Sequence, residues 1–548
     1  MMAYQLQVVA DKIAELLQRE GAEHVVGFPE NRLIDSAAAL GMRPIITRTE
    51  RVAVNIADGF ARATNGERFL PCVAQYGPGA EAAFGAVAQA YGDRSPILLV
   101  PGEHDRAAQA PPNICAETAY APVTRFAATV NDAAAAPEVF RRALHAVRVV
   151  RDGPVLVAVA NDVMCADAGE GRWDVATGPR RLSAAAPQDV AEALRMLAEA
   201  SRPVILAGQG VLYAGATDEL VALAERTGTP VATTLNGKSA FPEDHPLALG
   251  TAARTRPETV DRFLGEADVV LGVGTSFTRS LYITPLPASA SLGQIVNDPR
   301  DLGTGYDIAF GCVGDVRVVL RQMLERLDAE AAPSRDPAAE IADVRSGFLD
   351  RWMPRLTSDA GPISPYRLVW DLMATVDRSR TVLTHDAGHP RDQIVPFYEC
   401  LAPRGYLGWG KSTQLGTGLG LTMGARLARS DRLAVNIMGD AAFGMVGMDV
   451  ETAVRCRIPI LTIVMNNGLM GGYGEYMPRA VERDGAHRLS GDYAAVGKAL
   501  GAYSERVSDA AELRAAITRC AAAVESGQTA LLEVMTHEEP ELALGPQA

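Results

Sequence analysis

Two stretches of sequence decide the fold, LAVNIMGDAA at residues 433–442 and ILTIVMNN at residues 460–467. Each opens with an apolar, β-branched run that has the length of a buried parallel strand. The segment between the two runs is therefore expected to be a crossover helix, which makes the unit βαβ. Because the parallel strands of such a unit end at the same edge of the sheet, Asp440 and Asn467 should converge.

These strand ends carry oxygen ligands. A carboxylate, an amide oxygen and a nearby backbone carbonyl suit a hard divalent cation, and such a cation commonly bridges to phosphate. The pair of strand ends therefore indicates a site for a metal and a diphosphate. The alternative is a purely structural βαβ unit, since Gly-Asp at the end of a strand is common.

The spacing closely resembles the signature of thiamine diphosphate enzymes, Gly-Asp-Gly followed by an Asn-Asn pair. The resemblance implies three ligands for Mg2+, which are the Asp440 carboxylate, the Asn467 side chain and the main-chain carbonyl of Leu469. It also implies that further residues bind the cofactor beside the diphosphate: Gly388, His389, Gly439, Ala441 and Ala442. Ala441 stands where the signature has its third glycine, so its methyl group makes the fit tighter.

Glu50 lies between an expected strand at residues 43–47 and an expected helix at residues 52–66. A glutamate in the first turn of a helix ordinarily serves only the helix dipole. The nearby run Ala-Asp-Gly-Phe-Ala-Arg-Ala-Thr, however, strongly resembles the segment in which this family carries its activating glutamate. The resemblance implies that Glu50 donates to N1′ of the aminopyrimidine, so that the 4′-imino nitrogen can remove the C2 proton.

The stretch KSTQLGTGLGLTMGA at residues 411–425 resembles the family segment that bends the cofactor into a V. The resemblance implies that Leu415 is the apolar side chain under the two rings. It also implies that the Thr413 carbonyl accepts a hydrogen bond from the 4′-amino group. A glycine-rich turn that opens a helix is the structural alternative.

Composition agrees with a large enzyme. At 548 residues the chain is too long for one hydrophobic core, and roughly three domains are expected. The net charge of −14 argues against nucleic acid and anionic membranes as partners. No signal peptide or membrane-spanning run is evident, and the seven cysteines are scattered without a Cys-x-x-Cys pair. We therefore expect small buried cysteines and a cytoplasmic location.

Strands and helices alternate along the chain, which predicts an α/β fold with three doubly wound, parallel-sheet domains. The order resembles the pyrimidine-binding, central Rossmann-like and diphosphate-binding domains of this family. We assign them to residues 1–170, 186–330 and 360–548. In relatives the central domain holds FAD, ADP or nothing, and the sequences Gly208-Gln-Gly210 and Gly272-Val-Gly274 are only weak nucleotide signals. We therefore expect a mainly structural domain, with bound FAD or ADP as the alternative.

The overall resemblance is to the acetolactate synthase-like branch, but the specificity positions differ. Acetolactate synthases have Pro-Gly-Gly where this chain has Pro29-Glu30-Asn31, and the paired histidines of pyruvate decarboxylases are replaced by Gln75-Tyr76. A site of amides and phenols can orient a carbonyl or protonate an alkoxide. Gln75 and Tyr473 are therefore candidate catalytic residues beside Glu50.

The leading hypothesis is an enzyme that makes or breaks a C–C bond next to the carbonyl of a small-molecule 2-oxo acid or acyl substrate, by decarboxylation or acyloin formation. The alternatives are a 2-hydroxyacyl-CoA lyase or oxalyl-CoA-type decarboxylase, and a non-catalytic nucleotide-binding relative. In this family Glu50 and the metal site come from different subunits. The resemblance therefore implies a homodimer or a dimer of dimers, that is a homotetramer, with active sites at the interface.

Overall fold

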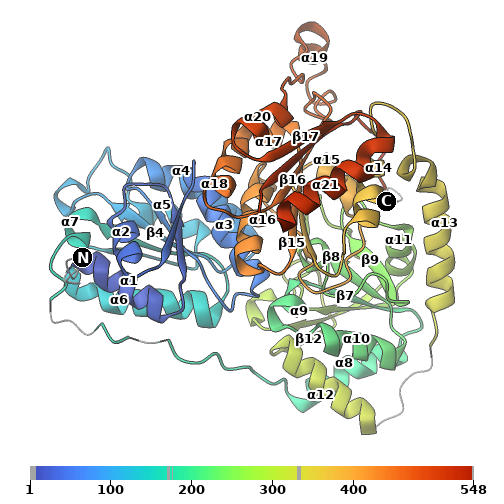
Figure 1. The fold of residues 1–548 in the computed structure, drawn as a ribbon. Helices are drawn as coiled ribbons and strands as arrows, with labels where there is room; N and C mark the ends of the chain where they lie inside the picture. Colours follow the sequence, from blue (N-terminus) through green and yellow to red (C-terminus); the bar gives the residue numbers. More distant parts are fainter. Residues whose placement is uncertain (1–7, 170–172, 176, 330–334, 546–548) are drawn as a thin grey trace.

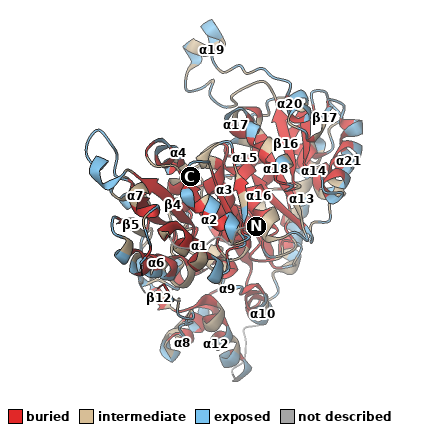
Figure 2. Cartoon of the chain, turned by 60° about the vertical axis from the view of Figure 1, so that its left-hand side comes forward, coloured by how far each residue is buried: buried red, intermediate tan, exposed pale blue. Residues whose placement is uncertain are grey.

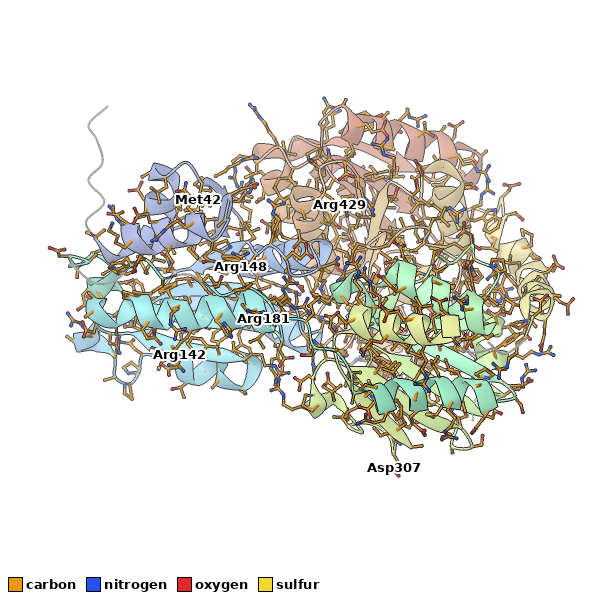
Figure 3. All side chains as sticks on the ribbon, turned by 90° about the horizontal axis from the view of Figure 1, so that it is seen from below. Met42, Arg142, Arg148, Arg181, Asp307 and Arg429 are labelled. Atoms are coloured by element: carbon orange, nitrogen blue, oxygen red, sulfur yellow. The ribbon has the colours of Figure 1, made fainter. Side chains whose placement is uncertain are left out.

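The computed structural model describes residues 8–169, 173–175, 177–329 and 335–545. They form three α/β blocks, each built on one six-stranded sheet in which every strand pair is parallel (Figure 1). The predicted fold class is therefore confirmed. Seen from below in Figure 3, helices of the N-terminal block lie beside those of the central block.

The N-terminal block has the strand order β2-β1-β3-β4-β6-β5. Its strands are β1 (His24–Gly27), β2 (Arg43–Ile46), β3 (Pro71–Ala74), β4 (Leu98–Glu103), β5 (Phe126–Val130) and β6 (Val155–Ala160). Its helices are α1 (Val9–Arg19), α2 (Arg32–Ala39), α3 (Glu50–Ala63), α4 (Pro78–Gly92), α5 (Ala116–Tyr120), α6 (Ala136–His145) and α7 (Asn161–Met164). Side chains fix where helices begin, since Asn31 caps α2 and Thr49 caps α3.

The central block has the strand order β12-β11-β10-β7-β8-β9. Its strands are β7 (Pro203–Ala207), β8 (Val231–Thr234), β9 (Ala248–Ala252), β10 (Val269–Val273), β11 (Ser291–Val296) and β12 (Phe310–Val313). Its helices are α8 (Pro187–Glu199), α9 (Gln209–Ala214), α10 (Thr217–Thr227), α11 (Glu258–Gly265) and α12 (Val316–Ala329). Helix α13 (Ala338–Leu356) follows and packs on α11 and on the third block.

The third block has the strand order β14-β13-β15-β16-β18-β17. Its strands are β13 (Thr381–His385), β14 (Tyr406–Leu407), β15 (Leu433–Gly439), β16 (Leu461–Asn466), β17 (Tyr503–Val507) and β18 (Ala530–Met535). Its helices are α14 (Pro365–Thr375), α15 (His389–Ile394), α16 (Thr417–Ala428), α17 (Asp440–Val446), α18 (Val450–Arg455), α19 (Pro478–Asp484), α20 (Tyr493–Ala499) and α21 (Leu513–Glu525).

The crossover between β15 and β16 corrects one expectation. It is not a single helix, because α17 and α18 are separated by a short 3-10 turn at Gly447–Asp449. Gly447 packs on the ring of Phe443, where a Cβ atom would lie 2.5 Å from Cε1. Gly447, a weak helix former, opens the turn at a place where the length of the segment predicted one continuous helix.

In each sheet the chain first adds strands on one side of a central strand and then continues on the other side. These switch points lie between β1 and β3, between β7 and β10, and between β13 and β15. Ligands of open parallel sheets bind in the crevice outside the carboxyl ends of the strands at such a point. The three blocks therefore offer three candidate crevices.

Helices α3 and α16 join the N-terminal block to the third block through closely packed glycines. A Cβ atom on Gly59 would lie 2.2 Å from the Leu421 carbonyl oxygen, and one on Gly424 would lie 2.0 Å from the Ile56 carbonyl oxygen. Only glycine permits backbones to approach this closely. This contact holds α3, whose first residue is Glu50, against the third block.

Figure 2 shows buried residues throughout the sheets, whereas α19 projects from the third block and is largely exposed. All seven cysteines are free, and five of them are buried. Cys115 and Cys165 are exposed, so the expectation of uniformly buried cysteines was wrong for these two. Among the described helices, none combines the length and the apolar character that crossing a bilayer requires.

Candidate active site

The ends of β15 and β16 converge, as the sequence predicted. Asp440 is the first residue of α17 and is 3% exposed. Its carboxylate accepts hydrogen bonds from the backbone N–H groups of Ala441 (2.8 Å) and Gly468 (2.9 Å). Gly468 directly follows Asn467, so this second bond joins the two strand ends.

The donor set at this edge suits a divalent cation. Burial raises the pKa of Asp440, and no cationic side chain of the described residues pairs with it. Asn467 is half-buried beside it, and its Oδ1 accepts from the Leu469 N–H at 3.0 Å. A bound Mg2+ would offset the cost of burying the carboxylate, with Asp440, Asn467 and the Leu469 carbonyl as its protein ligands.

At the same edge of the sheet, the backbone of two glycines has free space beside it. Gly388 follows β13 with φ +84°, and a Cβ atom built on it would meet nothing within 4 Å. At Gly439, at the end of β15, only Pro390 Cγ would lie within 4 Å. Two glycines therefore flank the β13/β15 switch point with free space beside them, and a diphosphate fits such a cradle.

Other residues expected beside the diphosphate occupy different surroundings. His389 begins α15, and its ring packs against Gly471, where a Cβ atom would lie 2.7 Å from Nδ1. Ala441 is half-buried at the start of α17, whereas Ala442 is buried and belongs to a core shared with α3. His389 and Ala441 thus remain at the open edge, and Ala442 serves packing.

The turn before α16 holds Thr413 and Leu415. Thr413 has φ +56° and Gly416 has φ +87°, so two left-handed residues flank Leu415. The Leu415 side chain is half-buried and packs against the cores of both the N-terminal and the third block. It thus lies where a bulky apolar side chain can support two aromatic rings.

Glu50 is the first residue of α3, and the side chain of the next residue, Arg51, reaches this turn, with Nη2 3.4 Å from a Cβ atom built on Gly416. The preceding residue pair is bound to the third block, because Asp449 accepts from the Arg48 N–H at 2.7 Å and from the Thr49 hydroxyl at 3.5 Å. Burial raises the pKa of Glu50, and among the described residues no cation forms an ion pair with it. The protonated acid is therefore favoured more than at an exposed glutamate.

Gln75 lies next to Glu50 at the carboxyl edge of the N-terminal sheet. A Cβ atom on Gly79 would lie 2.8 Å from Gln75 Cβ and 3.0 Å from Glu50 Oε1, so Gly79 separates the two side chains. The Gln75 side-chain amide donates to Glu30 Oε2 at 2.5 Å. Glu50, Gln75 and Glu30 therefore form a polar row across three neighbouring strand ends.

Tyr473 is not gathered into this row. It lies in the segment that leads to α19, it is 47% exposed, and its ring centroid is 6.2 Å from that of Tyr476. Its hydroxyl forms no hydrogen bond with any residue in the described part of the chain. Its expected catalytic role has no geometric support in the single chain.

Sequence reasoning missed three residues that organise the site. Asp386 accepts hydrogen bonds from the turn before α16, Arg51 points toward the same turn, and Asp449 fixes the start of α3. Asp386 directly follows β13, so a search for carboxylates at strand ends could have found it. Arg51 and Asp449 give no such signal, because their partners are hundreds of residues away in sequence.

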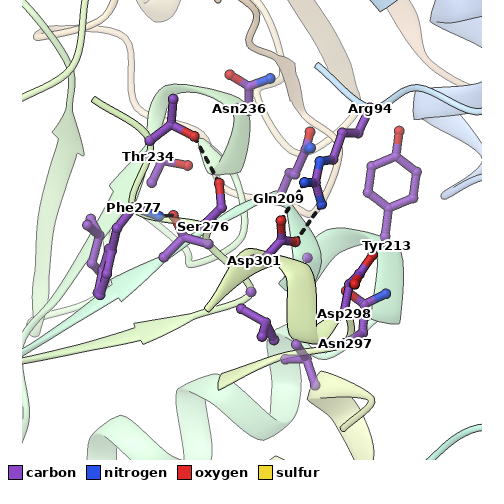
Figure 4. A pocket seen from close by; sticks show the side chains of 18 of the residues that line it. Arg94, Gln209, Tyr213, Thr234, Asn236, Ser276, Phe277, Asn297, Asp298 and Asp301 are labelled. Atoms are coloured by element: carbon purple, nitrogen blue, oxygen red, sulfur yellow. Dashed lines mark hydrogen bonds and ion pairs between the residues drawn. The ribbon is translucent and has the colours of Figure 1, made fainter. Parts of the chain in front are cut away.

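A separate cavity of about 400 Å³ lies at the switch point of the central sheet (Figure 4). Its floor is formed where Gly208 and Gly274 touch, since a Cβ atom on Gly208 would lie 2.3 Å from the Gly274 carbonyl oxygen. Arg94 of the N-terminal block pairs with Asp301 at its rim. Lys411, which precedes the Thr413 turn, also lines it, and burial lowers the pKa of Lys411.

Models of thiamine pyrophosphate (thiamine diphosphate) enzyme domains match the chain in three places. The N-terminal TPP binding domain matches residues 7–122, the central domain residues 190–323 and the C-terminal TPP binding domain residues 386–534. The matched regions contain Glu50, the central cavity's Gly208 and Asp440, respectively.

Curated relatives of two kinds match most of the chain. The probable acetolactate synthase large subunit of Methanocaldococcus jannaschii is 30% identical over 490 residues, covering 84% of this chain and 80% of the relative. The probable 2-ketoarginine decarboxylase AruI of Pseudomonas aeruginosa is 29% identical over 520 residues, covering 91% and 89%. Acetolactate synthase isozyme 3 of Escherichia coli is 25% identical over 553 residues, covering 96% and 94%. The chain therefore belongs to the thiamine pyrophosphate enzyme family, in its acetolactate synthase-like branch.

Proposed function

We propose that this thiamine diphosphate enzyme makes or breaks a C–C bond next to the carbonyl of a 2-oxo acid, with Mg2+ as its metal. The observation that carries the proposal is the convergence of Asp440 and Asn467 beside the open glycines of the β13/β15 switch point. A buried carboxylate that pairs with no cation of the described residues suits a metal-bound diphosphate.

The residues of this chain have separable roles in the proposal. When bound, thiamine diphosphate supplies a stabilised carbanion at its C2 atom. Asp440, Asn467 and the Leu469 carbonyl hold the metal, and Leu415 supports the bend between the rings. Glu50 holds a proton for the pyrimidine N1′ atom, which its raised pKa favours. Gln75, adjacent to Glu50, orients the substrate carbonyl.

A substrate panel tests the proposal. CO2 release and acyloin formation are followed from several 2-oxo acids, with and without aldehyde acceptors, in the presence of thiamine diphosphate and Mg2+. CO2 release alone identifies a decarboxylase, and acyloin formation identifies a carboligase. Activity only on acyl-CoA substrates would favour the CoA lyase or oxalyl-CoA-type decarboxylase alternative. Failure to bind the cofactor would favour the non-catalytic relative.

A cationic 2-oxo acid is a second, narrower candidate substrate. Glu30 has φ +77°, which is unfavourable for a residue other than glycine, and its carboxylate has no cationic partner among the described residues. It borders a hollow of about 570 Å³ that Asn31 and Tyr76 also line. A guanidinium group would neutralise it, and 2-ketoarginine in the name of the Pseudomonas aeruginosa relative carries one.

A neutral isostere of the guanidinium compound tests whether the charge of the substrate is recognised. The parent should prefer 5-guanidino-2-oxopentanoate over the 5-ureido compound by roughly tenfold or more, the usual effect of one hydrogen bond to a charged group. Glu30→Gln should remove the preference while it keeps the hydrogen-bonding shape. A parent enzyme that treats both compounds alike would refute the candidate and leave the broader function intact.

We also propose a bound nucleotide, ADP or FAD, in the cavity of the central block. Its position at the β7/β10 switch point supports a nucleotide, and Arg151, Arg180 and Lys411 of its mixed-charge lining offer cationic groups for phosphates. The lining also holds four carboxylates, those of Asp152, Asp298, Asp301 and Asp315. The purified protein is denatured, and the released material is examined by absorption spectroscopy and chromatography. A flavin spectrum identifies FAD, and an adenine spectrum alone identifies ADP.

We further propose a cytoplasmic homodimer or dimer of dimers. Exposed apolar side chains on α17, the following turn and α4 support contact with a second copy, namely Met445, Met448 and Phe84. Mixing Glu50→Gln chains with Asp440→Ala chains tests how the halves combine. Restored activity means that the two halves come from different subunits. No restoration in a mixed dimer means that each chain completes its own site, as the α3–α16 contact permits.

A further inference from the structure

We propose that Asp386 is a positioning residue that fixes the turn at residues 413–418 for the pyrimidine end of the cofactor, and that Arg51 ties this turn to the Glu50 helix. The inference rests on the proposed function. Asp386 and Arg51 take no part in a chemical step and instead hold the two halves of the site in one arrangement.

The Asp386 carboxylate is completely buried just beyond β13. Its Oδ1 accepts hydrogen bonds from the N–H groups of Ala387 (2.9 Å) and Gly416 (2.8 Å), and its Oδ2 accepts from Gly418 (3.1 Å). One carboxylate oxygen therefore holds the backbone at Gly416, and the other oxygen holds it at Gly418. One side chain thus fixes the residues on both sides of Thr417.

The turn needs such support because its backbone is unfavourable. Thr413 has φ +56°, a left-handed conformation that a β-branched residue rarely adopts. Leu415 lies between Thr413 and Gly416 and is the side chain expected under the cofactor rings. A small change in the backbone here would move both the Thr413 carbonyl and the Leu415 side chain.

His385, the last residue of β13, contacts Trp409, which precedes this turn in the sequence. Its ring stacks on Trp409 at a centroid distance of 5.1 Å, and the Trp409 indole N–H donates to the His385 carbonyl at 3.0 Å. The Trp409 backbone N–H donates to His385 Nε2 at 3.4 Å. Burial lowers the pKa of His385 to about 3, which keeps the ring neutral and able to accept this bond.

Arg51 connects the turn to the neighbouring helix. It directly follows Glu50, and its Nη2 atom would lie 3.4 Å from a Cβ atom on Gly416. Its buried Nε has no hydrogen-bond partner in the described part of the chain. Burial lowers the pKa of Arg51, and the charge of the nearby Asp386 carboxylate opposes this shift. A displacement of Asp386 is therefore transmitted to the residue beside Glu50.

Asp386→Asn tests the positioning role. The amide keeps the size of the side chain but turns one acceptor into a donor, which would face a backbone N–H. We expect tenfold or greater loss of thiamine diphosphate affinity and slower deuterium exchange at C2 of bound cofactor. Cofactor affinity is measured by calorimetry and exchange by NMR, so neither readout depends on turnover.

Asp371→Asn is the matched control. Asp371 is a completely buried carboxylate of the same block, on α14, and it pairs with Arg367 and Arg514 at 2.6 Å. Replacing the Asp371 carboxylate should lower the free energy of unfolding without changing cofactor affinity or the C2 exchange rate. If Asp371→Asn slows exchange as much as Asp386→Asn at equal loss of stability, Asp386 has only a general structural role and the proposal is overturned.

Arg51→Gln provides a second variant in case Asp386→Asn does not fold. It should also slow C2 exchange, with Glu50 still present. The double variant should be no worse than the more affected single variant, because both residues act on one turn. Unchanged exchange in Arg51→Gln, or fully additive losses, would overturn the link. If the parent itself fails to bind thiamine diphosphate, the proposed function has failed instead.

Discussion

Replacing Glu50 by glutamine should separate catalysis from folding. Glutamine is nearly isosteric and can still hydrogen-bond to N1′, but it cannot transfer a proton to that nitrogen. Losing one positioned proton-transfer group lowers turnover by roughly two to four orders of magnitude, or about 3–5 kcal/mol in activation free energy. The described residues form no ion pair with Glu50, so the substitution breaks no salt bridge.

The effect of Glu50→Gln on stability should be much smaller. The main loss is the interaction of a first-turn carboxylate with the helix dipole, which is worth about 0.3–1 kcal/mol. Glu81 offers a matched control, because it is an exposed carboxylate in the first turn of the neighbouring helix α4. Glu81→Gln should lose the same dipole interaction and keep full activity.

The decisive assay is exchange of the C2 proton of bound cofactor with deuterium. Exchange in Glu50→Gln should be slowed by roughly the same two or more orders of magnitude as turnover, while cofactor affinity and the denaturation midpoint stay close to those of the parent. Exchange at the parent rate would remove Glu50 from cofactor activation. An equal loss in Glu81→Gln would show that the helix dipole, and not proton transfer, is responsible.

Three further predictions concern the metal, the helix contact and pH. Asp440→Ala should abolish Mg2+-dependent binding of thiamine diphosphate in calorimetry, and normal affinity would contradict the assigned ligand. Gly59→Ala should destabilise the protein by about 1–3 kcal/mol through overpacking, because its Cβ would lie 2.2 Å from the Leu421 oxygen, whereas Gly265→Ala, with open space around it, should have little effect in urea unfolding. Burial raises the pKa of Asp386 to about 6 from 3.8, so the folded state binds more protons between these values. The stability of cofactor-free parent relative to Asp386→Asn should therefore fall as pH rises from about 4 to 6 and stay level above about 7. A pH-independent difference would contradict this.

The sequence was informative where polar residues end apolar runs. The β-branched runs before Asp440 and Asn467 could only be buried strands, and the rule for parallel strand ends then brought the two residues together. Glu50 was predicted to activate the cofactor from the motif around it and not from its position in a helix. The crossover after Asp440 was predicted less well, because the prediction overlooked the low helix propensity of Gly447, which opens the turn between α17 and α18.

Other parts of the site could not be predicted, because they depend on contacts between blocks. Nothing near Arg48 in the sequence announces Asp449 of the third block as its partner. The Glu30 backbone also takes a conformation that its residue type disfavours. For Tyr473 the sequence suggested a phenol in the pocket, whereas the structure puts it on an exposed segment whose direction local pattern does not encode.

The glycine contact between α3 and α16 also matters for attempts to change what the enzyme accepts. Random libraries that reach these helices will lose most of their members, because any side chain added at Gly59 or Gly424 collides with a backbone oxygen. The loops after β1 and β3 face less restriction, since Glu30 is exposed beside a hollow and Gln75 is only half-buried at the sheet edge. Laboratory evolution of new substrate ranges should therefore draw its successful mutations from these loops and leave the helix pair untouched.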